Sequence, residues 1–280
     1  MSAVPPNSEA TSPETKLQRA QPLGKSHLTV VPRVIIALIL REMSSTYGRK
    51  PGGYVWAVLE PLATISIMAL AFGVFLHSPS LGTNFFLFYA TGVLTLNFFR
   101  DISGKISLAI AYNRPLLTYP RVALLDSLIA RGILSFMTQF MVSVIVLTGI
   151  YAMMDVNEHI NFGPVLAGLG LGVLLGAGMG TLNAFVMIRF PVWTNLWAIV
   201  SRPLAFVSGL FYIYEDLPPI AQSVLWFNPL IHVTGLVRQG VYATYHPGYI
   251  SVPYVLAFGI VPLVFGLLLI RRFGRSLLTE

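Results

Sequence analysis

The 280-residue chain is 55% hydrophobic and only 10% charged, and its mean hydropathy is +0.73. Because soluble globular domains carry about 25% charged residues, this composition excludes an ordinary soluble domain and indicates a polytopic membrane protein. The net charge of +7 does not indicate a nucleic-acid-binding protein, because the cations are scattered over separate loops rather than gathered on one face. The chain has no cysteine, and its five histidines show no metal-ligand spacing, so we expect neither a metal nor a cofactor in it.

The N-terminal 27 residues are rich in Pro, Ser, Thr, Glu and Gln, and they lack the basic-then-apolar order of a secretory signal. We predict a disordered cytoplasmic tail over residues 1–27 and one transmembrane domain over residues 28–280. Gly24, Lys25 and Ser26 resemble the end of a phosphate-binding loop, but Arg19 stands where the first glycine of that motif belongs. The sequence therefore disfavours a nucleotide site in this chain.

Residues 28–48 form an apolar run that is too short to cross a membrane. At about 100° per residue, Arg33, Arg41 and Ser44 share one face of a helix, which predicts a helix in the membrane interface with its basic face toward the headgroups. Glu42 projects into the apolar side, where an unpaired carboxylate is costly. We therefore expect Glu42 to pair with a cation on a neighbouring element.

Six apolar stretches approach the roughly 20 residues that a helix needs to cross a bilayer. The expected spans are residues 55–76, 85–103, 123–150, 164–188, 196–213 and 252–270. The predicted fold is therefore an all-α membrane protein with six transmembrane helices. Most Lys and Arg residues lie before the first span and after the second, fourth and sixth spans, so by the positive-inside rule these segments and both termini face the cytoplasm.

Glu60 lies about two turns into the first span, directly before Pro61, which removes a backbone donor and favours a kink. A carboxylate inside a membrane is a functional candidate by default. Two interpretations remain open. Either Glu60 reaches the interface and pairs with Arg41 or Arg49, or it steadies the interface helix against the first span during gating.

Polar residues recur every four positions on one face of the second span, with one cation beside them: Asn97, Asp101, Lys105 and Arg100. Such a face avoids lipid, so it either lines the cytoplasmic mouth of a hydrated path or forms pairs within the helix bundle. At the start of the third span, Asp126 and Arg131 are five residues apart and do not stack on the helix surface. We expect each of them to pair with another segment.

Three blocks of sequence are specific enough to suggest a family. The first runs from Leu40-Arg41-Glu42 through Tyr47-Gly48-Arg49 to Gly53-Tyr54-Val55-Trp56-Ala57-Val58-Leu59-Glu60-Pro61. The second comprises Asn113, Leu116, Tyr119, Val122, Asp126, Ala130 and Arg131, and the third comprises Trp226, Asn228, Pro229, His232 and Arg238. Together with the six-span plan, these blocks resemble the permease subunits of ABC-2 type ATP-binding-cassette exporters, particularly those exporting capsular polysaccharide. The sequence departs from that pattern at Ala123-Leu124, Phe227 and Gly235.

The resemblance implies a homodimer in the bacterial inner membrane that moves a lipid-linked polysaccharide outward. It also implies two copies of a soluble ATPase that bind Mg-ATP, periplasmic and outer-membrane export proteins as further partners, and no enzymatic activity in this chain. In the resembled family the protomers meet mainly through the first and fifth spans. We therefore expect the glycines at four-residue intervals in the fourth span to pack within the chain; they are Gly168, Gly172, Gly176 and Gly180.

A permease without a nucleotide site receives mechanical work from its ATPase partner through a rigid element. We expect the segment of residues 107–122 to be that coupling helix. Pro disfavours the α conformation in the residue before it, so Asn113-Arg114-Pro115 is predicted to break the preceding helix, and Leu116, Leu117 and Tyr119 then offer an apolar contact surface. A plain amphipathic connector is the alternative.

The loop of residues 214–251 contains an apolar stretch too short to cross the membrane, which predicts a re-entrant or interfacial helical pair on the outer face. It carries Trp226, Asn228, Pro229, His232 and Arg238. Arg238 is the single cation of the outer loops, so we expect it to pair with Glu215 or Asp216, with a lipid phosphate as the alternative. By resemblance, this element helps to close the channel exit.

Aromatic residues make up 12% of the chain, and most lie near span ends, as expected of aromatic belts. Phe72, Phe98 and Phe206 are our predictions for a glycan path. Export of another glycan, such as O-antigen or teichoic acid, remains an alternative. A secondary transporter would show related halves and a membrane enzyme a catalytic constellation, and the sequence indicates neither.

Overall fold

The computed structural model describes residues 27–46, 52–117 and 123–274. Within these residues the chain forms helices and connecting loops and no strand, so the predicted all-α class is confirmed. Almost all of the predicted N-terminal tail lies outside the described residues. The predicted interface helix of residues 28–48 corresponds to α1 (His27–Thr46).

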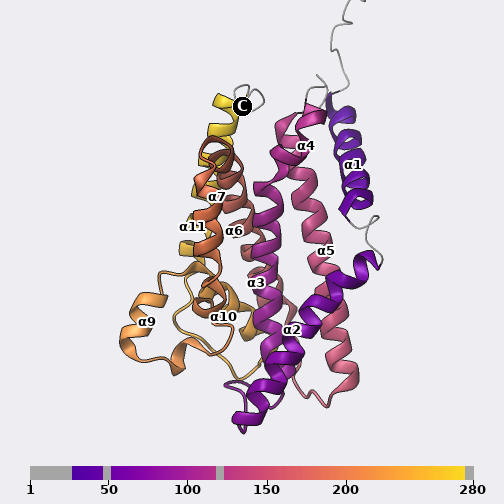
Figure 1. Ribbon diagram of the computed structural model, residues 1–280. Coiled ribbons are helices and arrows are strands. Elements are labelled where there is room, and N and C mark those ends of the chain that lie inside the picture. Colours follow the sequence, from indigo (N-terminus) through magenta and orange to yellow (C-terminus); the bar gives the residue numbers. More distant parts are fainter. Residues whose placement is uncertain (1–26, 47–51, 118–122, 275–280) are drawn as a thin grey trace, which may run out of the picture.

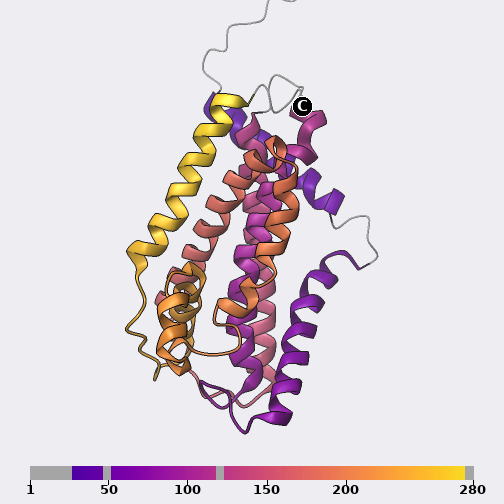
Figure 2. The same ribbon diagram turned by 60° about the vertical axis from the view of Figure 1, so that its left-hand side comes forward.

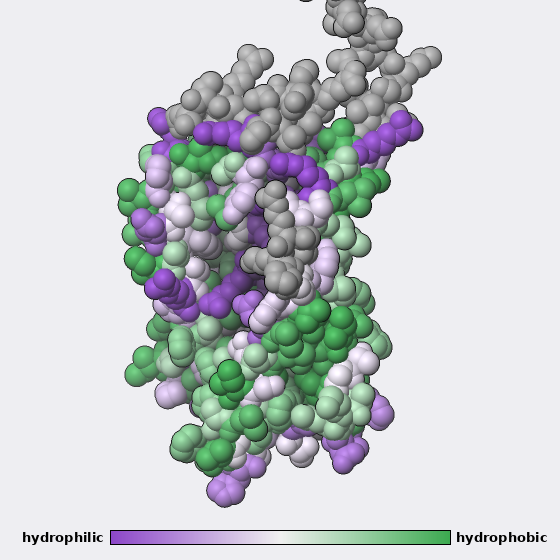
Figure 3. Space-filling view, turned by 45° about the vertical axis from the view of Figure 1, so that its right-hand side comes forward, coloured by the Kyte–Doolittle hydropathy of each residue, from purple (hydrophilic) through white to green (hydrophobic). Residues whose placement is uncertain are grey.

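The helices form a bundle around α3 (Phe85–Ser107), which packs against α6 (Phe162–Arg189) on one side and α5 (Leu124–Met153) on the other. α2 (Gly53–Phe75) crosses α3, and α11 (Val252–Phe273) lies along α6. Figure 1 shows α1, α4 (Ala109–Leu117) and the end of α11 at the same end of the bundle. Figure 3 shows hydrophilic residues gathered toward that end and hydrophobic residues over much of the opposite half.

Four helices of the described chain are long and apolar enough to cross a membrane, namely α2, α5, α6 and α11. A fifth crossing is added if α9 (Pro219–Leu225) and α10 (Pro229–Val241), which are bent by 103° relative to each other, form one broken span. α3 is equally long, but it carries Arg100, Asp101 and Lys105 in its last two turns. The sequence-based prediction of six spans therefore requires that α3 and the segment after α6 also cross the membrane.

The single helix predicted over residues 196–213 is wrong. The structure has α7 (Val192–Ser201), then a break at Arg202 and Pro203, then the short α8 (Leu204–Val207). Pro203 has no N–H to continue the hydrogen-bond ladder of α7. Gly209 follows with φ +76°, a backbone conformation that favours glycine, so the chain turns where a continuous span was expected.

The predicted break at Asn113-Arg114-Pro115 is also wrong, because α4 runs through Pro115 to Leu117. The chain bends instead at Leu108, between α3 and α4. Pro115 stands two residues before the end of α4, where its missing N–H costs one hydrogen bond and leaves the start of the helix intact.

The glycine track of α6 packs within the chain, as predicted. A Cβ atom at Gly168 would lie 2.6 Å from Val237 on α10, and one at Gly176 would lie 3.0 Å from Cβ of Ile102 on α3. The small residues therefore let α10 and α3 approach the backbone of α6 closely. This packing places the polar end of α3 at the centre of the bundle.

Candidate functional site

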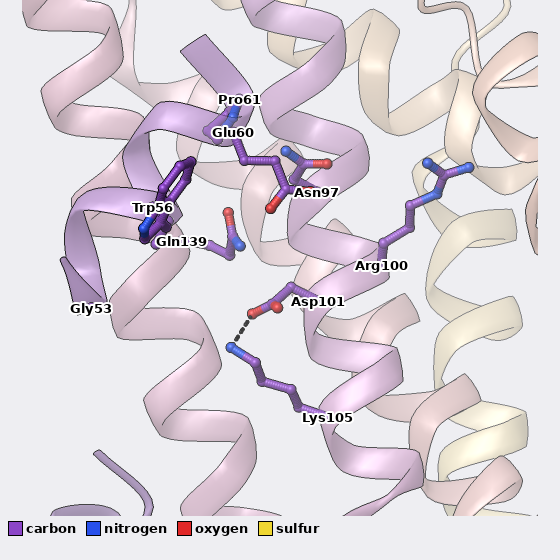
Figure 4. A pocket seen from close by; sticks show the side chains of 10 residues that line it. Gly53, Trp56, Glu60, Pro61, Asn97, Arg100, Asp101, Lys105 and Gln139 are labelled. Carbon is purple, nitrogen blue, oxygen red and sulfur yellow. Dashed lines mark ion pairs between the residues drawn. The ribbon is translucent and has the colours of Figure 1, made fainter. Parts of the chain in front are cut away.

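A polar pocket of about 500 Å³ lies between α2, α3 and α5. Figure 4 shows the polar side chains of its wall and Trp56 around one cavity. The polar residues that line it are Glu60 from α2, Asn97, Arg100, Asp101 and Lys105 from α3, and Gln139 from α5. The pocket brings together the intramembrane carboxylate and the polar face of the second predicted span, which the sequence analysis had treated separately.

The pocket exists because α2 packs on the bundle with only part of its length. The buried residues of α2 are Pro61, Ile65 and Ala69, and the last two belong to the main apolar cluster. Toward its N-terminal end α2 leans away from the bundle (Figure 2). Glu60, in the N-terminal part of α2, lines the pocket. A polar face on α3 and the amide of Gln139 border this space, so the gap is polar rather than filled by side chains.

Three of the α3 residues on the pocket wall also make pairs within the bundle. Asp101 forms an ion pair with Lys105, at 3.0 Å, and accepts a hydrogen bond from the Ser135 hydroxyl of α5. Arg100 donates to the carbonyl oxygens of Ser201, at 2.8 Å, and of Arg202. The guanidinium thus holds the break between α7 and α8 against α3. Pairing within the bundle is therefore confirmed for Arg100, Asp101 and Lys105, which also line the pocket. The cytoplasmic mouth of a hydrated path stays a prediction.

A second polar cluster joins α1 to α4 and α5. Glu42 accepts a hydrogen bond from Nη2 of Arg131 at 2.5 Å, and Arg41 donates to the side chain of Asn113 at 2.9 Å. The Arg131 guanidinium also lies 4.5 Å from the ring centre of Tyr112 on α4, a favourable cation–π arrangement. Glu42 thus meets a cation on another element, as the sequence predicted, and Arg131 pairs away from Asp126.

Other predicted contacts of this region differ. Asp126 accepts from the backbone N–H of Ala123, at 3.0 Å, and so caps the start of its own helix instead of pairing with another segment. Arg41 is engaged by Asn113, and Glu60 lies on the pocket wall, so the structure shows no Glu60–Arg41 pair. Arg49 and Tyr119 lie outside the described residues, as do the side chains of Pro115, Leu116 and Leu117.

At the opposite end of the bundle, Arg238 of α10 is fully buried. It donates to the carbonyl oxygens of Tyr212, at 2.7 Å, and Leu210, at 3.2 Å, and its guanidinium lies 4.1 Å from the ring centre of Phe88 on α3. The predicted pair with Glu215 or Asp216 is therefore wrong. An irregular segment presents free carbonyl oxygens, and these satisfy the guanidinium in place of a carboxylate.

The rest of the segment around α9 and α10, residues 219–251, is held by directional hydrogen bonds. Asn228 precedes Pro229, the first residue of α10. Its side chain accepts from the N–H of Leu230 and donates to the carbonyl of Val207. Nε2 of His232 lies 2.8 Å from the carbonyl oxygen of Trp226, and Nδ1 lies 3.3 Å from the N–H of Ser251. One imidazole therefore joins α9, α10 and the start of α11.

Glu215 has a different partner, the hydroxyl of Tyr245, which donates to it at 2.9 Å. Burial raises the pKa of Tyr245, and the neighbouring Tyr249 and Glu215 raise it further. The hydroxyl therefore stays protonated and remains a donor throughout the physiological pH range.

The three predicted path aromatics do not line the polar pocket. Phe98 is fully buried, and its ring lies 6.2 Å from that of Phe136. Phe72 packs against Tyr89 and Phe211, and the exposed Phe206 stacks on Phe211 at 5.4 Å. Sequence reasoning missed Gln139, whose signal was an isolated amide in the apolar run of the third predicted span.

No group of three or more metal-ligating side chains occurs within residues 27–46, 52–117 and 123–274. Membrane-length helices around an internal polar pocket are typical of the transmembrane subunit of a transporter. Residues 33–242 match the family of ABC-2 type transporters, and the chain belongs to this family of multi-pass membrane proteins.

Relatives match almost the whole chain. It is 30% identical to the polysialic acid transport protein KpsM of Escherichia coli over 258 residues, which cover 92% of this chain and 100% of that protein. It is 29% identical to the capsule polysaccharide export inner-membrane protein CtrC of Neisseria meningitidis over 252 residues, or 89% and 94% of the two chains. The corresponding protein BexB of Haemophilus influenzae is 28% identical over 256 residues, or 90% and 95%.

Proposed function

We propose that this chain is the permease subunit of an ATP-binding-cassette exporter that moves lipid-linked capsular polysaccharide outward across the bacterial inner membrane. The observation that carries the proposal is the end-to-end similarity to polysialic acid and capsule polysaccharide export proteins. The match covers the full length of KpsM. The polar pocket among apolar helices supports a hydrated path for a polar polymer.

A separate ATPase drives transport by hydrolysing Mg-ATP. The complex contains two ATPase copies and two permease copies. The α1–α4–α5 cluster supports α4 as the coupling helix, because Arg41 and Arg131 tie it to the interface helix and to a long membrane helix. A push on α4 then moves α1 and the end of α5 as well. In the proposed coupling segment the buried Asn113 ties α4 to α1, while Arg114, Pro115, Leu116, Leu117 and Tyr119 face the ATPase.

In the proposed topology, α3 is the second span, α7 with α8 is a broken fifth span, and both termini are cytoplasmic. The gathering of α1, α4 and the basic end of α11 at one end of the bundle supports this orientation (Figure 1). The pocket then lies in the cytoplasmic half, where Glu60 and the polar face of α3 form the mouth of the path. The outer element with Arg238 and His232 closes the exit.

The homodimer forms through α2 and α7. Both helices expose large apolar side chains, including Trp56, Ile67 and Val74 on α2 and Ile199 and Val200 on α7. Periplasmic and outer-membrane export proteins receive the polymer.

Deleting the gene in its source bacterium and restoring it from a plasmid tests the proposal. We expect the deletion strain to lose surface polysaccharide and to accumulate a lipid-linked polymer inside the cell, and the plasmid copy to reverse both changes. Chemical analysis of the accumulated polymer distinguishes a capsular glycan from O-antigen or teichoic acid. Unchanged surface polysaccharide without internal accumulation would overturn the proposal.

A matched arm inactivates the partner ATPase while the permease remains intact. Loss of export with the permease still folded in the membrane supports an ATP-driven subunit. Export that continues on an ion gradient alone contradicts it.

A further inference from the structure

A second cavity, about 560 Å³, opens between α5 on one side and α6 with α11 on the other. Its lining is apolar except for one threonine hydroxyl, and it runs along α5 from Leu125 to Phe136. Leu263 and Leu267 of α11 form the facing wall. Leu125 and Phe136 are 43% and 40% exposed, so the groove opens on the outer surface of the bundle.

The groove forms because small residues let some helices pack more closely than others. Glycines bring α11 and α6 together, because Gly266 would place a Cβ atom 2.7 Å from the backbone nitrogen of Leu182. α5 packs on α3 instead, and it approaches the end of α11 where Leu124 meets Gly274. Beyond that contact the small residues Gly132 and Ala177 leave the surface hollow.

The length of the groove matches one leaflet of a bilayer. Eleven residue steps separate Leu125 from Phe136, and at 1.5 Å per residue they cover about 16 Å. Half of the hydrocarbon core measures about 15 Å. One extended acyl chain of a membrane lipid therefore fits the groove end to end.

A cation stands at the end of the groove. Arg271 follows Leu267 by four residues and Leu263 by eight, so it lies about one turn beyond the lining on the same side of α11. Its side chain is exposed and forms no ion pair or hydrogen bond within residues 27–46, 52–117 and 123–274. The next residue differs, because the Arg272 guanidinium lies 5.7 Å from the ring centre of Phe273.

We propose that this groove is a binding site for an anionic phospholipid of the bilayer, with one acyl chain along α5 and the phosphate at Arg271. A guanidinium forms paired charge-assisted hydrogen bonds to phosphate, and the apolar wall holds the chain. The groove does not share a lining residue with the polar pocket, so the site is separate from the proposed transport path.

Photocrosslinking in lipid nanodiscs tests the site. The full-length protein is reconstituted with its ATPase partner in phosphatidylcholine containing a few per cent of phosphatidylglycerol with a photoactivatable acyl chain. Labelled peptides are identified by mass spectrometry, and an equal amount of photoactivatable phosphatidylcholine serves as the comparison. We expect labels in α5 and α11 at the groove, with about tenfold more label from phosphatidylglycerol. The choline ammonium of phosphatidylcholine offsets the attraction between its phosphate and Arg271, and phosphatidylglycerol has no such cation.

Matched variants separate the two parts of the site. Arg271→Gln should remove the preference for phosphatidylglycerol, while Arg272→Gln should keep it. Ile129→Trp, which fills the groove, should reduce labelling by both lipids, while Met137→Trp on an exposed part of α5 outside the lining should not.

Equal labelling by both lipids in the unmodified protein, or labels spread evenly over all lipid-facing helices, overturns the proposal. A groove crosslinked to a helix of another protein copy, without lipid label, also overturns it. None of these outcomes bears on polysaccharide export, so the two proposals fail independently.

Discussion

Glu42 on α1 and Arg131 on α5 form an ion pair of 2.5 Å, although 89 residues separate them, and their side chains are only 14% and 8% exposed. The pair is an ionic connection between α1 and α5, the long helix that follows α4. Nη1 of the same guanidinium donates to the carbonyl oxygen of Lys105 at 3.3 Å. One side chain therefore joins α1, α3 and α5 where α4 begins to diverge from the bundle.

Replacing Glu42 with Ala should destabilise the protein by about 3 kcal/mol or more, because the substitution leaves the buried Arg131 without its charge partner. Thermal unfolding of the detergent-solubilised protein measures the change. Arg33→Ala, which removes an exposed cation from the same helix, is the control and should leave the melting temperature unchanged. Equal melting temperatures of the Glu42→Ala and unmodified proteins would show that the pair contributes nothing to stability.

The contact between Arg41 and Asn113 should matter more for transport than for folding. Asn113→Ala removes one hydrogen bond to a cation, worth about 1.5–3 kcal/mol, and loosens α4 from α1. We expect ATP hydrolysis by the complex to continue while export falls several-fold, as measured by radiolabelled polysaccharide in inverted vesicles. Ser44→Ala, an exposed hydroxyl that bonds only within α1, is the matched control. Parallel loss of hydrolysis and export would point to a general folding defect.

Glu60→Gln tests the polar pocket. The substitution keeps the size of the side chain, removes its charge and replaces one acceptor oxygen with an NH2 donor. The pocket is the proposed path of the polar polymer. We expect export to change several-fold while the melting temperature stays within about 1 °C, since a substitution away from packed contacts costs less than about 0.5 kcal/mol. Asp216→Asn, an exposed carboxylate near the opposite end, should change neither quantity. Export equal to that of the unmodified protein would exclude a role for the Glu60 charge.

Arg238→Lys should not preserve the outer element. Arg238 contacts two carbonyl oxygens and the face of Phe88 with one planar guanidinium, and a lysine ammonium has neither that fork nor that stacking surface. We expect a loss of about 2–4 kcal/mol in unfolding free energy, because a buried polar network is left partly unsatisfied. Thermal unfolding followed by tryptophan fluorescence suits the measurement, since Trp226 lies in this element. Arg202→Lys, whose side chain is exposed, should be neutral.

Sequence periodicity predicted the helices well, because bilayer thickness and hydrophobicity alone define most of them. It also predicted that Glu42 meets a cation, since a lone carboxylate on an apolar face has few alternatives. It failed at Pro203 and Gly209, because a local break within an apolar run does not alter hydropathy. It failed again at Arg238, whose partners are carbonyl oxygens of an irregular segment, and every residue type carries such oxygens. The pocket residues were found as separate signals, and only the packing of α2 on α3 places Glu60 and Asn97 on the wall of one pocket.

The glycines of α6 support a sharper prediction, because they differ in how closely a neighbouring helix approaches. A Cβ atom at Gly180 would lie 2.9 Å from the carbonyl oxygen of Ser103 and 2.9 Å from Cβ of Ile106, so Gly180→Ala forces α3 and α6 apart. Overpacking of this kind costs about 1–3 kcal/mol. Gly170 on the same helix has no neighbouring atom within 4 Å of the added Cβ, so Gly170→Ala should be neutral or slightly stabilising through the higher helix propensity of alanine. Thermal unfolding of both variants in the same detergent decides the matter, and equal melting temperatures would show that α3 moves away from α6 at little cost.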